Sequence, residues 1–158
     1  MRGNEKVLAA LNEALAEELT ALSQYFLHAE MSRHWGYLRL YPAWKKISVQ
    51  EMKHAEELIE RILFLEGEPN MTPPLKLRVG KDTQGALESD LALELEAVAM
   101  YNRAVRLAEE AGDNGTRELF EKLLAEEEGH ADWLEKQLHQ IGEIGYERYL
   151  AEQMHSEQ

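Results

Sequence analysis

A pattern of glutamate and histidine residues occurs twice in this chain, and it constrains the fold more than any other feature. Glu18 is followed 33 residues later by Glu51, and His54 lies three residues beyond that. The same spacing, shifted by 76 residues, gives a second set: Glu94, Glu127 and His130. On a helix, residues three positions apart are neighbours, so each Glu-x-x-His pair places a carboxylate beside an imidazole. The sequence therefore predicts two related halves, each supplying two carboxylates and one imidazole.

Apolar residues recur at helical spacing along most of the chain, and the breaks in this pattern separate long helices. We expect helices at about residues 4–34, 42–66, 83–111 and 116–141, and a short last helix from Tyr146 to about Met154. Gly36 marks the end of the first helix, and the segment Gly112–Gly115 separates the third from the fourth. Gly142 and Gly145 bracket the final break. The predicted fold class is all-α.

The segment from Gly67 to Asp82 is long and irregular, and it contains three of the four prolines. At about 3.3 Å per residue it can run the length of a helix of about 25–30 residues. Short turns make helices one and two, and helices three and four, antiparallel hairpins, so a crossover makes the second and third helices parallel. We expect one domain, residues 1–158, forming a four-helix bundle with one long crossover and a short fifth helix.

This topology brings the two sets of glutamates and histidines to the same height, because each lies about 17 residues from its turn. Facing inward, four carboxylates and two imidazoles form one cage whose charge balances two divalent cations. A lone Glu-x-x-His pair is more simply a solvated surface pair, but two copies at one offset argue against that interpretation. Without metal, four buried glutamates would have to take up protons or destabilise the core. Ligation by carboxylate and imidazole without sulfur favours iron or manganese.

Composition excludes several classes of function. The chain has no cysteine, which excludes disulfides, zinc–thiolate sites, iron–sulfur clusters and thiol nucleophiles. A formal net charge of −13 disfavours nucleic acid as a partner, since a polyanion is bound by basic clusters. The amino terminus has no apolar targeting region, and no stretch is apolar for the ~18–20 residues that a membrane span needs. We therefore expect a cytoplasmic protein that contacts neither nucleic acid nor membrane.

The repeated residues on a bundle with one long crossover resemble the ferritin-like di-iron proteins. Within that superfamily the chain is most similar to the bacterioferritins, over essentially its whole length. The likeness includes the short fifth helix and the segment SVQEMKHAEELIERILFLEG. It implies that Glu51 and Glu127 bridge two irons in each subunit. It also implies that two pairs complete one iron each: Glu18 with His54, and Glu94 with His130.

Met52 distinguishes the bacterioferritins from their relatives. It follows Glu51, so on a helix it points about 100° away from the cage, toward the outside of the bundle. A helical methionine is usually core filler. In the bacterioferritins, however, this position is a haem ligand. The resemblance implies that two subunits meet on a twofold axis and that each gives one methionine to a single b-type haem.

Two aromatic positions and two departures from the family also stand out. The resemblance implies that Tyr25 donates an electron during oxygen chemistry. Tyr101 lies at the matching position of the second repeat, and we expect it to hydrogen-bond a ligand carboxylate. Trp133 fits core packing as well as a role near the metals.

Lys46 and Gln50 occupy the positions where some family members build an additional iron site. We do not expect that site here, because protonated lysine cannot ligate iron. The other histidines are assigned to the surface or to packing: His28, His34, His139 and His155.

The resemblance implies an iron-storage protein with ferroxidase activity. Fe²⁺ would be oxidised by O₂ or H₂O₂ and stored as a ferric mineral inside a hollow homo-oligomer of 24 subunits built from dimers. Haem would pass electrons inward for iron release, and a small ferredoxin would supply these electrons. Two alternatives are a di-iron peroxidase of the rubrerythrin type and a DNA-protecting miniferritin. The first commonly carries a four-cysteine iron domain, and the second has its short helix between the second and third helices.

Overall fold

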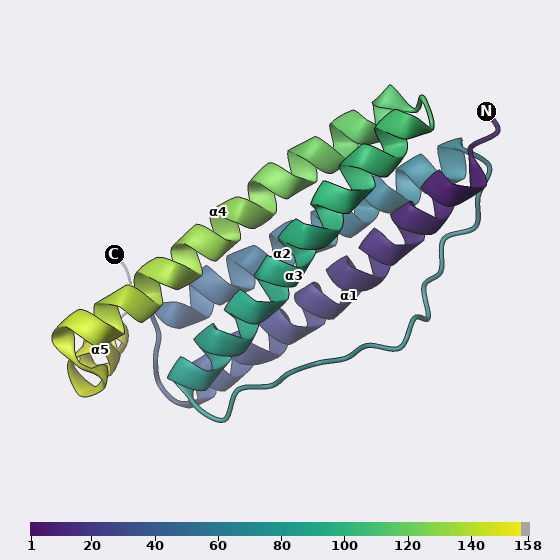
Figure 1. The fold of residues 1–158 in the computed structure, drawn as a ribbon. Helices are drawn as coiled ribbons and strands as arrows, with labels where there is room; N and C mark the ends of the chain where they lie inside the picture. Colours follow the sequence, from purple (N-terminus) through teal and green to yellow (C-terminus); the bar gives the residue numbers. More distant parts are fainter. Residues whose placement is uncertain (156–158) are drawn as a thin grey trace.

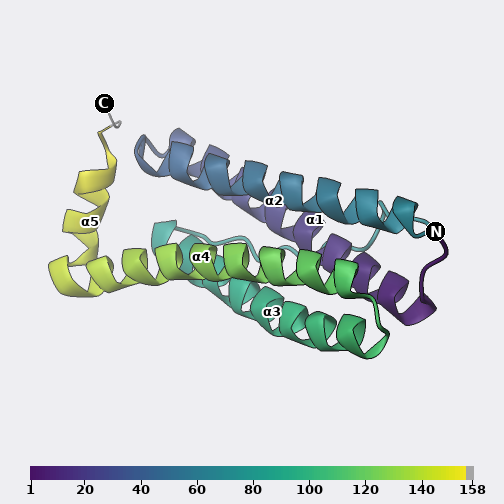
Figure 2. The same ribbon diagram turned by 90° about the horizontal axis from the view of Figure 1, so that it is seen from above.

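The computed structural model describes residues 1–155, and over this range the chain forms a bundle of antiparallel helix pairs. The helices are α1 (Glu5–His34), α2 (Leu40–Phe64), α3 (Thr83–Glu110), α4 (Asn114–Ile144) and α5 (Tyr146–Gln153). Helices α1 to α4 run lengthwise beside one another, and α5 turns away from the end of α4 (Figures 1 and 2). The predicted all-α, ferritin-like bundle with a short carboxy-terminal helix is confirmed.

The crossover runs along the outside of the bundle from the end of α2 to the start of α3 (Figure 1). Helix α1 packs mainly against α2, and α3 packs mainly against α4. The side chain of Asn12 on α1 holds the start of the crossover, donating to the carbonyl of Glu68 at 3.1 Å and accepting from the N–H of Asn70 at 2.8 Å. The Oε1 atom of Gln24, also on α1, accepts from the N–H of Arg78 near its end at 3.0 Å. These contacts fix the parallel course of α2 and α3.

Side-chain caps start three of the long helices. Asn4 accepts hydrogen bonds from the N–H groups of Lys6 and Val7 at the start of α1. Asp82 accepts from an N–H in the first turn of α3, and Asp113 does the same for α4. Asp113 also accepts from the guanidinium of Arg61 at 3.0 Å, which links the end of α2 to the α3–α4 turn.

The apolar core is divided into two clusters by a polar layer at the middle of the bundle. One cluster uses residues 7–15 of α1 and 55–65 at the end of α2, with matching parts of α3 and α4. The other uses residues 21–29 of α1 and 40–47 of α2, and includes the fully buried Trp44. The repeated glutamates and histidines fall between the two clusters on all four helices. Their mid-bundle position therefore follows from the register of the apolar residues on either side.

Two helix ends differ from the expectation. Helix α4 continues through Gly142 and ends at Ile144, before Gly145 with φ +87°. The predicted break at Gly142 was wrong, because one glycine costs a helix only about 1 kcal/mol and does not stop it. Helix α2 ends at Phe64, and Glu66, which we expected to be helical, has a left-handed φ of 62°. No helix within residues 1–155 combines the length and the apolarity that crossing a bilayer requires.

Candidate metal centre

All six residues of the repeated pattern point into the polar layer at the middle of the bundle. Their exposed fractions are 8% or less, and they come from all four long helices: Glu18, Glu51, His54, Glu94, Glu127 and His130. The inward direction follows from helical spacing, since apolar core residues precede and follow each of them by one or two turns on the same face. The structure therefore brings together every residue that the repeat singled out.

The six residues form two overlapping groups of four. One group is Glu18, Glu51, His54 and Glu127, and the other is Glu51, Glu94, Glu127 and His130. Within each group the potential ligand atoms all lie within 4.8 Å of one another. The rings of His54 and His130 lie 6.1 Å apart, centroid to centroid, and are nearly parallel. Two neighbouring cations that share a pair of carboxylates would fit this arrangement.

Three carboxylate oxygens in the layer are buried without a well-formed hydrogen bond: Glu18 Oε2, Glu51 Oε1 and Glu94 Oε2. The nearest imidazole nitrogens lie 3.4 Å from Glu18 Oε2 and 3.2 Å from Glu51 Oε1. An unpaired buried acceptor is costly, and native proteins seldom leave one without a reason. Here three such oxygens converge on the same small volume as two imidazoles. Metal cations would satisfy them, and oxygen–nitrogen ligation of this kind suits iron and manganese.

Two buried tyrosines hold the carboxylates across the two halves of the repeat. The O–H of Tyr25 on α1 donates to Glu94 Oε1 on α3 at 2.6 Å. The O–H of Tyr101 on α3 donates to Glu18 Oε1 on α1 at 2.6 Å. The hydrogen bond expected for Tyr101 is present, and Tyr25 makes the equivalent bond, which sequence reasoning did not assign to it. Burial is the first cause that raises the pKa of both phenols, and the neighbouring carboxylate adds to it.

Each imidazole is also held from its outer side. The Nδ1 atom of His54 faces the cage, 3.0 Å from Glu127 Oε1, while its Nε2 atom contacts the carboxylate of Glu126. In His130, Nδ1 lies 3.3 Å from Glu127 Oε2, and Nε2 lies 2.9 Å from Gln50 Oε1. An acceptor on the outer nitrogen fixes the ring and leaves the inner nitrogen for a metal. No sequence signal singles out Glu126, which stands in a run of three glutamates.

The protonation of the buried carboxyl groups follows mainly from their burial. Burial is the largest effect that raises the pKa of Glu18, and nearby carboxylates add to it. Burial also leads the effects that raise the pKa of Glu94. For Glu127, burial acts in the same direction, but hydrogen bonds from the surrounding groups outweigh it and lower the pKa. The surroundings of the centre therefore favour the carboxylate form of Glu127 and oppose the carboxylate forms of Glu18 and Glu94.

The two imidazoles hold protons. Burial disfavours the charged form of His130, but hydrogen bonds to carboxylates, Glu127 first among them, raise its pKa to about 12. Burial also disfavours the charged form of His54, but hydrogen bonds to carboxylates again outweigh it and raise the pKa. At neutral pH the metal-free centre is thus protonated on both rings. A divalent cation must displace these protons to reach its ligands.

Metal binding is accordingly expected to release protons and to become tighter as the pH rises. At pH 7 about two protons or more should leave for each filled centre, since both rings must lose theirs. Titration calorimetry with Co²⁺ in two buffers that differ in ionisation enthalpy measures this number. A binding heat that is the same in both buffers would contradict the expectation.

The same pKa shifts set how the stability of the metal-free protein depends on pH. A histidine whose pKa is 6.5 unfolded and about 12 folded stabilises the protein fully below pH 6.5. That contribution is lost as the pH rises toward 12. The free energy of unfolding of the metal-free protein should therefore fall from about pH 6.5 upward. Added Co²⁺ should reverse the loss, which thermal unfolding with and without the metal would detect.

Met52 lies on the opposite, outward side of α2. Its exposed fraction is 43%, whereas that of the preceding Glu51 is 1%, so the expected direction away from the cage holds. Val49, one turn earlier on the same face, is 36% exposed, and Phe26 on the adjacent α1 is 49% exposed. The Nζ atom of Lys45 lies 5.0 Å from the centroid of the Phe26 ring. The thioether is thus exposed beside Val49 on the outer face of α2, and the Phe26–Lys45 pair joins α1 to α2 about two turns earlier on α2.

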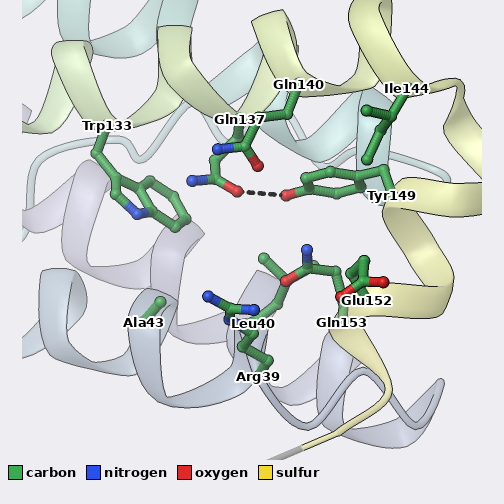
Figure 3. A pocket seen from close by; sticks show the side chains of 10 residues that line it. All are labelled: Arg39, Leu40, Ala43, Trp133, Gln137, Gln140, Ile144, Tyr149, Glu152 and Gln153. Atoms are coloured by element: carbon green, nitrogen blue, oxygen red, sulfur yellow. Dashed lines mark hydrogen bonds between the residues drawn. The ribbon is translucent and has the colours of Figure 1, made fainter. Parts of the chain in front are cut away.

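Lys46 and Gln50 lie on the other side of the metal centre, in a pocket of about 400 Å³ that reaches His130 and Trp133. A second pocket, of about 320 Å³, adjoins it and shares Trp133, which is half-buried. Figure 3 shows the indole of Trp133 at one end of this second pocket and Tyr149 at the other, with the Tyr149 O–H donating to Gln137 at 2.6 Å. Trp133 therefore lines a surface pocket as well as packing against the core.

Comparison with known proteins gives one consistent result. Residues 8–144 match the family model of the ferritin-like domain. The bacterioferritin of Brucella melitensis is 44% identical over 149 residues, which cover 94% of this chain and 92% of the relative. The bacterioferritin of Mycolicibacterium paratuberculosis is 42% identical over 152 residues, 96% of each chain. The bacterioferritin of Rhodobacter capsulatus is 41% identical over 145 residues, 92% of this chain and 90% of the relative.

Proposed function

The chain belongs to the ferritin-like family and to its bacterioferritins, and on that premise we propose that it stores iron and oxidises Fe²⁺ before storage. One observation carries the proposal: two four-residue groups of buried carboxylates and imidazoles overlap at Glu51 and Glu127. A site of this kind places two Fe²⁺ ions side by side. Each can then give one electron to the same oxidant, O₂ or H₂O₂.

We assign Glu18 and His54 to one Fe²⁺ and Glu94 and His130 to the other, with Glu51 and Glu127 shared. Four carboxylates balance the charge of two divalent ions once the stored protons have left. The redox chemistry belongs to the metal, and the protein supplies position and charge. The tyrosine hydrogen bonds orient the outer carboxylates, and the acceptors behind the imidazoles keep each Nδ1 atom directed at the metals.

Tyr25 is the residue that we propose as an electron donor during oxidation. Its O–H already contacts the ligand Glu94, so the phenol proton has an acceptor when an electron leaves the ring. On the pocket side of the centre, Lys46 and Gln50 provide no anionic ligand. We therefore propose no additional iron site there, although the pocket does connect His130 to the surface.

Met52 and its surroundings fit a haem. The side chain offers a soft thioether sulfur that is exposed, with the exposed apolar Val49 one turn earlier on the same face of α2. We propose that Met52 from each of two subunits binds one b-type haem. When bound, the haem would supply electron transfer toward the stored mineral, releasing iron as Fe²⁺. The donation of those electrons by a small ferredoxin is proposed from the family likeness alone.

A hollow shell of 24 subunits completes the proposal. Aerobic addition of Fe²⁺ in large excess over the two-metal site tests it. We expect the iron to stay in solution, bound to a particle that sediments as 24 subunits, and the rapid phase of oxidation to vanish after preloading with Zn²⁺. A 12-subunit particle would favour the miniferritin alternative. A particle of a few subunits that turns over H₂O₂ without holding excess iron would favour the peroxidase.

A further inference from the structure

A second buried polar cluster lies outside the metal centre, around Asp90 on α3. The Nε2 atom of Gln24 donates to Asp90 Oδ1 at 2.8 Å, and the Nε1 atom of Trp44 donates to Asp90 Oδ2 at 2.9 Å. The Nδ1 atom of His28 lies 2.9 Å from Oδ1 and 3.1 Å from Oδ2. All four side chains are 1% exposed or less, and they come from α1, α2 and α3. We refer to these four residues as the Asp90 cluster.

The hydrogen bonds determine where the protons of the Asp90 cluster lie. His28 Nε2 accepts from the backbone N–H of Gly80 at 3.0 Å, so this nitrogen carries no proton. The ring proton is therefore on Nδ1, facing Asp90, and the imidazole is neutral. Gln24 Oε1 accepts from the N–H of Arg78, which directs the amide nitrogen at Asp90. Three neutral donors thus surround one carboxylate, and the cluster holds one buried negative charge.

This charge changes the chemistry of Trp44. An indole that loses one electron becomes a radical cation, which is stabilised by a negative charge at its N–H group. The attraction is strong here because the cluster is shielded from water. Within residues 1–155, the indole N–H that donates a hydrogen bond to a carboxylate is that of Trp44. Of the three tryptophans, Trp44 is the one whose surroundings favour oxidation.

The Asp90 cluster is also connected to the metal centre. Trp44 and Tyr25 belong to the same group of packed, fully buried side chains. Asp90 lies one turn before Glu94 on α3, and Tyr25 donates its hydrogen bond to Glu94. Tyr25 thus contacts the metal centre through Glu94 and belongs to the same apolar cluster as Trp44.

We propose that Trp44 is a reserve electron donor behind Tyr25, and that Asp90 makes it oxidisable by stabilising the radical cation. The proposal rests on the ferroxidase function and applies when H₂O₂ meets a centre that holds a single Fe²⁺. Peroxide then takes one electron from Fe²⁺, one from Trp44 and two protons from solvent, giving two waters, Fe³⁺ and the Trp44 radical cation. The second electron travels from Trp44 through Tyr25. Tyr25 transfers its phenol proton to Glu94 when it is oxidised and takes the proton back when Trp44 reduces it again. The second electron prevents the release of a hydroxyl radical.

The Asp90 cluster also has a plain structural role, because it fastens the end of the crossover to α1. That role uses the contacts of Gln24 with Arg78 and of His28 with Gly80. It requires no oxidation of the indole. Protein stability therefore cannot separate the two roles, and the test has to observe the radical itself.

The first experiment uses metal-free protein and a photogenerated ruthenium(III) oxidant. We expect the wild type to form a long-lived tryptophan radical that keeps its N–H proton, recognised by absorption at longer wavelength than the neutral radical. Trp44→Phe should lose this signal, while Trp35→Phe and Trp133→Phe should retain it. Asp90→Asn, if it folds, should shorten the lifetime by at least about tenfold. An unchanged radical in Trp44→Phe, or a neutral one in the wild type, would overturn the proposal.

The second experiment adds one Fe²⁺ per subunit and then H₂O₂, with freeze-quench electron paramagnetic resonance. The wild type should accumulate the tryptophan radical, whereas Trp44→Phe should accumulate a tyrosyl radical and release more spin-trapped hydroxyl radical. Equal radical spectra and equal trapping in the two proteins would refute the role of Trp44 in peroxide chemistry. Slow Fe²⁺ oxidation in the wild type would instead refute the ferroxidase function, and the photochemical result would decide the oxidisability of Trp44 independently.

Discussion

Replacing Glu51 and Glu127 together by alanine is expected to abolish the rapid oxidation of Fe²⁺, lowering its rate by more than about 100-fold. These two carboxylates belong to both groups of potential ligands, so their loss removes two of the four ligands from each metal position and the link between the two positions. The bundle should still fold, because the two apolar clusters on either side of the polar layer are unchanged.

Stopped-flow absorbance after anaerobic Fe²⁺ loading and mixing with O₂ measures this loss. The matched control is the double substitution of Glu56 and Glu128 by alanine, since these exposed glutamates lie on the same two helices. The control should keep the rapid phase, and circular dichroism should show both variants to be helical. If the rapid phase persists in the Glu51 and Glu127 variant, the assignment of these residues is wrong.

The fold and the polar layer could be predicted because both depend on spacing along the chain. A shift of 76 residues relates Glu18 to Glu94, and it implies two similar hairpins before any contact is known. The length of the crossover then makes α2 and α3 parallel. Counting residues outward from the turn of each hairpin places the glutamates and histidines at one height along the bundle. The structure places them there.

The partners on the outer side of the two imidazoles could not be predicted, because they come from other helices without a fixed spacing. Glu126 reaches His54 from α4, and Gln50 reaches His130 from α2. Nothing in the sequence distinguishes Glu126 from its acidic neighbours. The contact depends on the rotation of two helices about their axes, which many side chains set jointly.

The Asp90 cluster could not be predicted from the sequence at all. Its residues come from three different helices and have no counterparts at the repeat offset. His28 was assigned to the surface or to packing, and it proves to be completely buried with both ring nitrogens in hydrogen bonds. At Gly142 the error was of another kind. A single glycine was taken as the end of the helix, although α4 continues through it to Ile144.

Replacing Met52 by leucine is expected to remove bound haem while leaving Fe²⁺ oxidation and shell assembly almost unchanged. Leucine has a similar volume and should cost less than about 1.5 kcal/mol in the free energy of unfolding. It offers no sulfur to iron, however. Met52 is 43% exposed on the outer face of α2, whereas the metal-centre residues of the same helix are buried. The substitution can therefore act on haem without reaching the polar layer.

A pyridine-haemochrome spectrum of the purified variant decides the matter, and Met154→Leu provides the control. Met154 is also an exposed methionine, at 55%, but it lies at the end of α5. The control should keep one haem for two subunits, and Met52→Leu should have none and should release stored iron more slowly when a reductant is supplied. A Met52→Leu protein that retains the haem would show that another residue is the axial ligand. Loss of rapid Fe²⁺ oxidation in this variant would mean that the two faces of α2 are coupled, contrary to the separation that burial indicates.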